Sequence, residues 1–113
     1  MIKPPVFKER SDTFLNTKLK KCLNRLNLRD WAVDLYLGDE VPEKFAGDEP
    51  GDSPAMVVYE AQYKMARIWV SPERSRRDNV DPLFYLYHEI IHIFLGVHDE
   101  EFECNNIASI LLG

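Results

Sequence analysis

The segment His88-Glu89-Ile90-Ile91-His92 carries the residues best suited to catalysis. Its two histidines are four positions apart, so on a helix they project from one face, one turn apart. Two neutral imidazoles at this spacing can bind one zinc ion. Glu89 follows the first histidine, where a carboxylate can take a proton from the attacking water and pass it to the leaving group. This H-E-x-x-H signature predicts a zinc-dependent hydrolase with His88 and His92 as ligands and Glu89 as catalytic base.

A third protein ligand is expected after the motif, because catalytic zinc sites usually have three protein ligands and one open position. Four candidates follow closely in the sequence, namely His98, Glu100, Glu101 and Glu103. Acidic residues here would also be favourable without a metal, since they would stand at the start of the next expected helix. The motif itself has a simpler interpretation, in which both histidines are core residues bonded to backbone.

The end of the chain resembles a known family. Residues 101–112 read E-F-E-C-N-N-I-A-S-I-L-L, similar to the E-x-x-C/A-N-x-x-A-x-x-L-L helix that follows H-E-x-x-H in the ImmA/IrrE metallopeptidases. Residues 65–70 resemble the strand before that family's motif helix. The resemblance covers about residues 55–112. It implies a zincin-like zinc endopeptidase with Glu101 as third metal ligand and a protein or peptide substrate, such as a specific regulatory protein.

Two other functions remain open. The spacing of His88, His92 and His98 resembles the YbeY family of metal-dependent endoribonucleases, although a glutamate directly after the first histidine is not usual there. A non-catalytic interaction module stabilised by a metal is the other alternative, with His98 as a further ligand that closes the site. The identity and the number of the ligands separate these three functions.

Hydrophobic periodicity predicts the elements that must position the motif. Residues 82–95 form an almost wholly apolar helix, with Asp81 as its cap, Pro82 at its first position and Gly96 as its stop. The other expected elements are a helix capped by Asp12 that runs to about residue 27, a strand at 31–37, a hairpin of strands 55–60 and 65–70, an exposed loop at 71–79 and a helix at 99–112. This order predicts an α+β domain over residues 1–113, with a small, mainly antiparallel sheet packed on helices.

The same pattern suggests how a substrate could be held. The strand at 65–70 could lie at the edge of the sheet and pair with substrate backbone. Tyr85 and Tyr87 flank the motif, and either phenol could stabilise a developing oxyanion.

Composition excludes several classes of function. The net charge of -5 equals that of residues 38–54, where six acids face one lysine, so the remainder is neutral and predicts no binding of nucleic acid. Four bases of the first helix, Lys18, Lys20, Lys21 and Arg25, lie off its apolar stripe and are expected to be a solvated face. The sequence shows no apolar run of membrane-spanning length and no signal peptide, and two cysteines are too few for a disulfide scaffold. We expect a cytoplasmic protein without a membrane partner.

Overall fold

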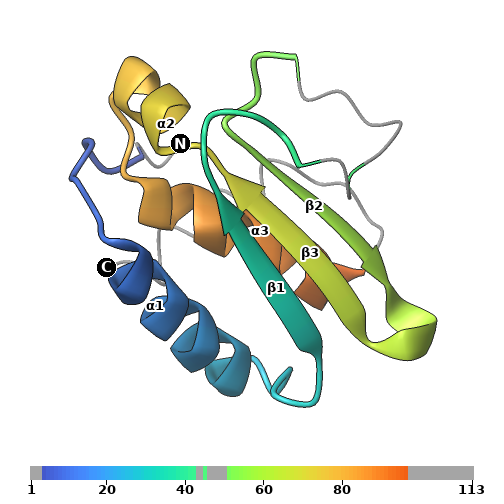
Figure 1. The fold of residues 1–113 in the computed structure, drawn as a ribbon. Helices are drawn as coiled ribbons and strands as arrows, with labels where there is room; N and C mark the ends of the chain where they lie inside the picture. Colours follow the sequence, from blue (N-terminus) through green and yellow to red (C-terminus); the bar gives the residue numbers. More distant parts are fainter. Residues whose placement is uncertain (1–3, 43–44, 46–50, 97–113) are drawn as a thin grey trace.

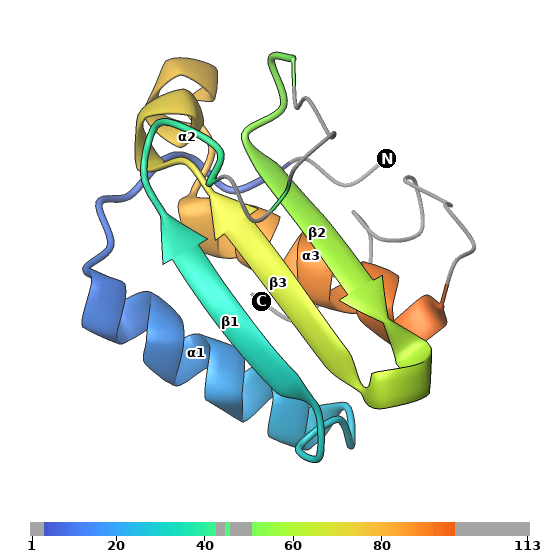
Figure 2. The same cartoon turned by 45° about the vertical axis from the view of Figure 1, so that its right-hand side comes forward.

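A three-stranded sheet covers two helices that lie side by side on one of its faces (Figures 1 and 2). The structure, a computed structural model, describes residues 4–42, 45 and 51–96. Its elements in chain order are α1 (Asp12–Arg25), β1 (Ala32–Leu37), β2 (Ala55–Glu60), the 3-10 turn η2 (Ala61–Tyr63), β3 (Met65–Val70), α2 (Pro72–Asp78) and α3 (Pro82–Leu95). The architecture is α+β, as predicted. The helix expected at 99–112 lies outside the described residues.

The sheet is mixed, so the prediction of a mainly antiparallel sheet was wrong. The strand order is β1-β3-β2, with β1 parallel to β3 and β2 antiparallel to β3. The chain leaves β1, crosses to the far edge to form β2, and then turns back to insert β3 between the two. Ile68, Trp69 and Val70 of β3 are each fully buried. The most buried strand therefore occupies the centre, and its second half is covered on both faces.

The hairpin of β2 and β3 has the boundaries that the sequence predicts. Ala55 pairs with Val70 at one end and Glu60 with Met65 at the other. The turn is a single 3-10 turn that ends at Lys64, whose φ of 52° is left-handed. This conformation reverses the chain without the Asn-Gly pair that the shortest hairpins prefer.

Helix α1 buries the predicted stripe of Leu15, Leu19, Cys22 and Leu23. Its cap is Ser11 and not Asp12, because the Ser11 hydroxyl accepts the backbone N–H of Phe14 at 3.1 Å. Asp12 is already helical and stands in the first turn, where its charge favours the helix dipole. The helix therefore starts with two favourable terminal residues and not one.

Helix α2 occupies the segment expected to be an exposed loop. Ser71 caps it by accepting the N–H of Arg74, and Pro72 stands at the first helical position. Its arginines bind the end of the acidic segment formed by residues 38–54. Arg74 donates to the carbonyls of Gly51 and Ser53 at 2.8 and 2.9 Å. These bonds hold residues 51–53 against α2.

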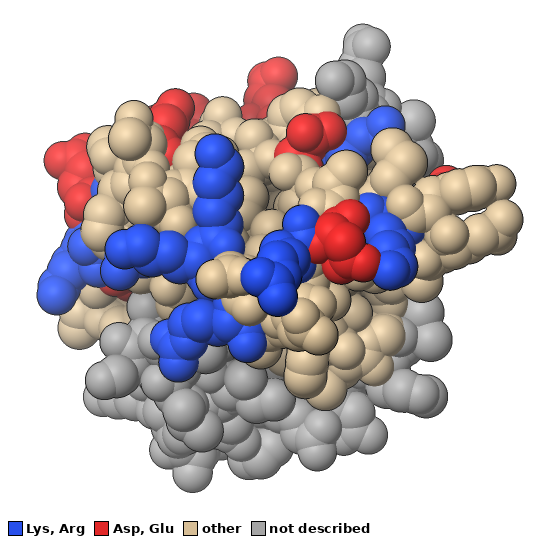
Figure 3. All heavy atoms as spheres, turned by 90° about the horizontal axis from the view of Figure 1, so that it is seen from below, with Lys and Arg blue, Asp and Glu red and all other residues tan. Residues whose placement is uncertain are grey.

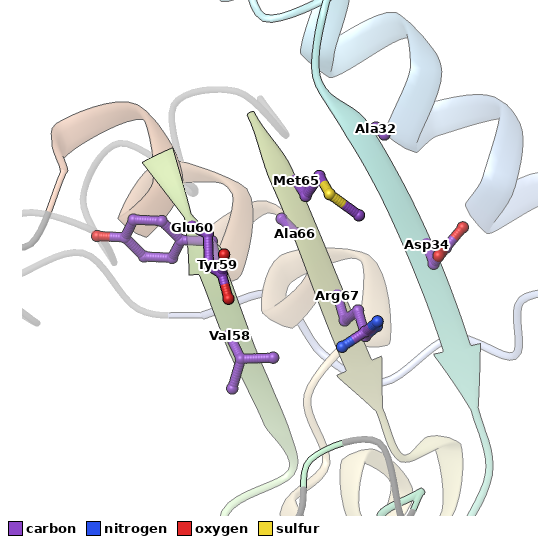
Figure 4. Close-up of a pocket in the computed structure, with 8 residues that line it drawn as sticks. All are labelled: Ala32, Asp34, Val58, Tyr59, Glu60, Met65, Ala66 and Arg67. Carbon is purple, nitrogen blue, oxygen red and sulfur yellow. The ribbon is translucent and has the colours of Figure 1, made fainter. Parts of the chain in front are cut away.

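The outer face of the sheet, opposite α1 and α3, is only partly covered. Phe45 is buried against the ring of Tyr36 in an edge-on contact, and the indole N–H of Trp69 donates to the Gly38 carbonyl at 3.0 Å. The other end of this face is open. A hollow of about 390 Å³ there is lined by Ala32, Asp34, Val58, Tyr59, Glu60, Met65, Ala66 and Arg67 (Figure 4).

Candidate metal centre

Helix α3 has well-defined ends, and these hold the H-E-x-x-H segment in position. The Asp81 carboxylate accepts the N–H of Leu83 at 3.0 Å, Pro82 follows at the first helical position, and Gly96 ends the helix with a φ of 80°. Asp81 is also held by Arg10, which donates to both carboxylate oxygens at 3.2 and 2.7 Å. This pair raises the pKa of Arg10, chiefly through the hydrogen bond. The N-terminal arm thus fixes the start of the motif helix.

His88 and His92 meet one turn apart, as the spacing predicts. Their Nε2 atoms are 2.9 Å apart, and their ring centroids are 4.6 Å apart. Zn–N bonds of about 2.0–2.1 Å at a tetrahedral angle place two ligand nitrogens roughly 3.3 Å apart. The observed separation needs only a small opening to reach this value. Both rings therefore already present the same nitrogen to a common point.

Glu89 completes a buried cluster with the two histidines. One ligand atom from each of the three lies within 4.8 Å of the others, and their exposed fractions are only 7–8%. Burial of two imidazoles and a carboxylate in one place is costly unless their polar atoms are well compensated. A divalent cation would provide such compensation, because imidazole nitrogens and a carboxylate oxygen are common metal ligands. The structure thus supports a metal-binding group at these residues.

The cluster faces away from the core stripe of its own helix. Leu83, Leu86 and Ile90 belong to the hydrophobic core formed with α1 and the sheet. Each histidine is two positions from Ile90, which is about 160° around the helix. The apolar core therefore anchors α3 from one side, while the metal-binding group occupies the other.

The two tyrosines beside the motif have different positions. Tyr87 belongs to the hydrophobic core together with Cys22 of α1, so an oxyanion role for Tyr87 is not supported. Tyr85 is three positions before His88, about 60° around the helix on the same side. Its hydroxyl donates to Asp78 of α2 at 3.2 Å, and burial, with the nearby Asp78, raises its pKa. Tyr85 is therefore a neutral phenol, held by α2.

The structure does not place the proposed third ligand. Glu101 and its alternatives His98, Glu100 and Glu103 lie outside the described residues, so Glu101 stays a prediction. The strand expected to bind substrate is described, and that expectation was wrong. β3 has a partner on each side, and the edges of the described sheet are β1 and β2. The reason is the crossover that brings β3 between them.

The hollow on the outer face is a separate feature that sequence reasoning missed. Figure 4 shows Met65 and Arg67 of β3 between Asp34 on β1 and Val58 on β2. α1 and α3 cover the opposite face, so this hollow does not open onto the metal-binding group. Alternation along the strands could have shown that these residues share a face, but not that the face would be open.

No protein-family model, curated protein or solved structure matches the chain. Among the described residues, no helix is long and apolar enough to cross a membrane. The functional argument therefore depends on the geometry of the chain's own residues.

Proposed function

We propose that this chain is a zinc-dependent metallohydrolase that cleaves peptide bonds. One observation carries the proposal: the buried cluster in which both histidines present Nε2 within 2.9 Å and Glu89 belongs to the same group of potential ligands. The signature predicted this arrangement. Two metal-free core histidines at this distance would share one hydrogen bond, with one ring as donor and the other as acceptor, so the metal content of the purified protein separates the two interpretations.

The roles of the residues follow from their chemistry. His88 and His92 hold the metal through Nε2. Zinc, when bound, supplies a Lewis acid that polarises the substrate carbonyl and lowers the pKa of water. Glu89 accepts the proton of the attacking water and then delivers it to the amine leaving group. The three side chains are only 7–8% exposed, and limited contact with bulk water strengthens the interaction of each charged group with the substrate.

The third ligand is proposed to be Glu101, following the resemblance to the ImmA/IrrE metallopeptidases, and the whole chain is then a minimal zincin-like peptidase. Glu101→Ala should weaken zinc binding far more than His98→Ala, because loss of one of three ligands leaves an incomplete site. A zinc titration of both variants measures this. A larger effect of His98→Ala would instead favour the three-histidine ribonuclease.

We propose a protein or peptide substrate, with a specific regulatory protein as the best candidate. A reducing compartment such as the cytoplasm suits the free, buried thiol of Cys22. The proposed reaction uses no nucleic acid and no membrane.

One observation favours a competing function. All three side chains of the cluster are more than nine-tenths buried, as expected for a structural metal site closed by a fourth protein ligand. X-ray absorption spectroscopy of the zinc-bound protein separates the two functions. Four protein ligands, with no water oxygen, would identify the closed site and refute the hydrolase.

The decisive variant is Glu89→Gln. Glutamine is nearly isosteric and can still hydrogen-bond water, but it cannot accept the proton. Activity should fall by about a hundred- to ten-thousand-fold, while zinc content and melting temperature stay close to wild type. Assays start with casein and a generic RNA, followed by candidate regulatory proteins.

The matched control is Glu73→Gln, which makes the same chemical change at an exposed carboxylate of α2. It should retain wild-type activity. Equal cleavage rates in wild type and Glu89→Gln would show that Glu89 is not the general base. Cleavage of RNA but not of casein would support the ribonuclease.

A further inference from the structure

Helix α1 carries a stripe of positive charge beside its apolar stripe. Its residues 12–25 include four bases and a single acid, Asp12. Lys18, Lys21 and Arg25 are separated by three and four positions, so they project from one side of the helix. Figure 3 shows Lys and Arg side chains gathered on the underside of the molecule. The net charge outside residues 38–54 is zero, but the bases of α1 still form a local basic surface.

These three bases surround a small pocket. Its volume is about 120 Å³, and it is lined by Lys18, Lys21, Cys22 and Arg25 of α1 and by Tyr87 of α3. At about 30 Å³ for each molecule of liquid water, the pocket has room for roughly four waters. An anion of about five heavy atoms fits this space, whereas a nucleobase does not.

The three bases of the pocket form no ion pair in the part of the chain that the structure describes, where the ion pairs are made by Arg10, Lys64, Arg76 and Arg77. The Lys18 ammonium lies 5.5 Å from the centre of the Phe14 ring. Tyr87 is only 7% exposed as a whole, but its hydroxyl is not a buried, unpaired atom and is therefore accessible at the pocket. A tyrosine hydroxyl at the end of an apolar ring can donate a hydrogen bond to an anion that enters such a pocket.

We propose that this pocket binds the phosphate group of a small phosphorylated ligand, or free phosphate. A phosphate dianion matches three cations around one pocket better than a single carboxylate does. The planar guanidinium of Arg25 can donate two parallel hydrogen bonds to phosphate oxygens, and the lysines contribute point charges. Tyr87 donates a neutral hydrogen bond from the inner wall. Lys20 does not line the pocket and belongs to the solvated face of the helix.

The remaining wall residue does not oppose an anion. Burial raises the pKa of the Cys22 thiol to about 11, so Cys22 carries no negative charge at neutral pH. The position of Arg25 in the last turn of α1 is also favourable to the helix dipole. That effect falls off within one turn, so it does not extend to Lys18.

The phosphate pocket is independent of the proposed hydrolase. Tyr87 and His88 are neighbours in the sequence, but they project about 100° apart from α3. Tyr87 faces the core and α1, whereas the histidines lie on the side opposite Ile90. Binding at this pocket requires neither zinc nor Glu89.

The test is a titration of the full chain with inorganic phosphate, O-phosphoserine and acetate, followed by NMR shifts of the backbone amides of α1 and residue 87. We expect saturable shifts with both phosphates and weaker binding of acetate. Lys21→Gln or Arg25→Gln should raise the dissociation constant at least about tenfold, the loss typical of a charge-assisted hydrogen bond. Tyr87→Phe, which keeps the ring in the core, should raise it roughly three- to tenfold.

Lys20→Gln is the matched control, because Lys20 is exposed on the same helix and does not line the pocket. It should change the dissociation constant less than about twofold, since a distant exposed charge is screened. Tighter binding of O-phosphoserine would identify a phosphorylated ligand, and tighter binding of inorganic phosphate would identify the free ion. Loss of affinity in Lys20→Gln equal to that in Lys21→Gln would reveal a diffuse basic surface and overturn the proposal. Unchanged affinity in Tyr87→Phe, or shifts confined to His88 and His92, would also overturn it.

Discussion

Helices α1 and α3 have the same length, 14 residues, and share one hydrophobic core, but they tolerate polar residues for different reasons. α1 buries one stripe and turns its charged residues to water. α3 buries 11 of its 14 residues, and three of these are His88, Glu89 and His92. A polar or charged side chain therefore has a higher desolvation cost on α3 than on α1.

This difference shows where a polar residue indicates function. A lysine on the exposed side of α1 keeps its hydration, so its presence requires no special explanation. A histidine or glutamate inside α3 loses its hydration and must be compensated by other interactions. Burial thus makes the H-E-x-x-H residues informative, whereas the bases of α1 are not buried.

The largest expected effect is on zinc content, which should depend on the histidines of α3 and not on exposed residues of α1. His88→Ala combined with His92→Ala should reduce bound zinc from about one ion per chain to almost none, because both nitrogen ligands are lost. Elemental analysis after purification without chelators measures this. The control is Asn16→Ala combined with Lys20→Ala, an exposed pair at the same spacing on α1. Full zinc content in the histidine double variant would refute the site.

A smaller effect concerns the core that anchors α3. Ile90 is completely buried, so Ile90→Ala should lower the free energy of unfolding by about 2–5 kcal/mol through lost burial and the cavity left behind. Lys20→Ala on α1 should change it by less than about 0.5 kcal/mol. Urea unfolding of the zinc-free proteins measures both. Comparable values for the two variants would show that α3 is not anchored through Ile90.

The smallest effect contrasts the two helix caps. Asp81 is 2% exposed and binds both Leu83 and Arg10, whereas Ser11 is an exposed cap. Asp81→Ala should cost about 2–3 kcal/mol, since it removes a cap and leaves the partly buried Arg10 without its partner. Ser11→Ala should cost about 1 kcal/mol. Equal costs in thermal unfolding would show that the Arg10 pair adds nothing to the cap.

The sequence predicted α3 and the hairpin correctly because both depend on local signals. Asp81, Pro82 and Gly96 mark the ends of the helix, and the apolar runs at 55–60 and 65–70 mark the strands. The spacing of His88 and His92 likewise predicted that their side chains would meet. The helix ends, the strand boundaries and the meeting of the two histidines are each determined by residues close to one another in the sequence.

The missed features depend on longer-range or weaker signals. Ser71-Pro72 resembles Asp81-Pro82 as a helix start, but residues 72–78 have no apolar stripe, so their pattern predicts a loop where α2 lies. Strand order depends on contacts between distant segments, and no local pattern placed β3 in the centre. The continuous apolar run Ile68-Trp69-Val70 was the available indication, because a strand buried on both faces loses the alternation of an edge strand.

The parallel pairing of β1 with β3 has a consequence for folding kinetics. Ala32 pairs with Met65, which lies 33 positions later, whereas β2 and β3 are joined by a short turn. Local contacts close quickly and distant ones slowly, so the hairpin should form before β1 docks. Until then, the most buried strand of the protein has an open backbone edge, which is a template for intermolecular association. The docking of β1 closes this edge.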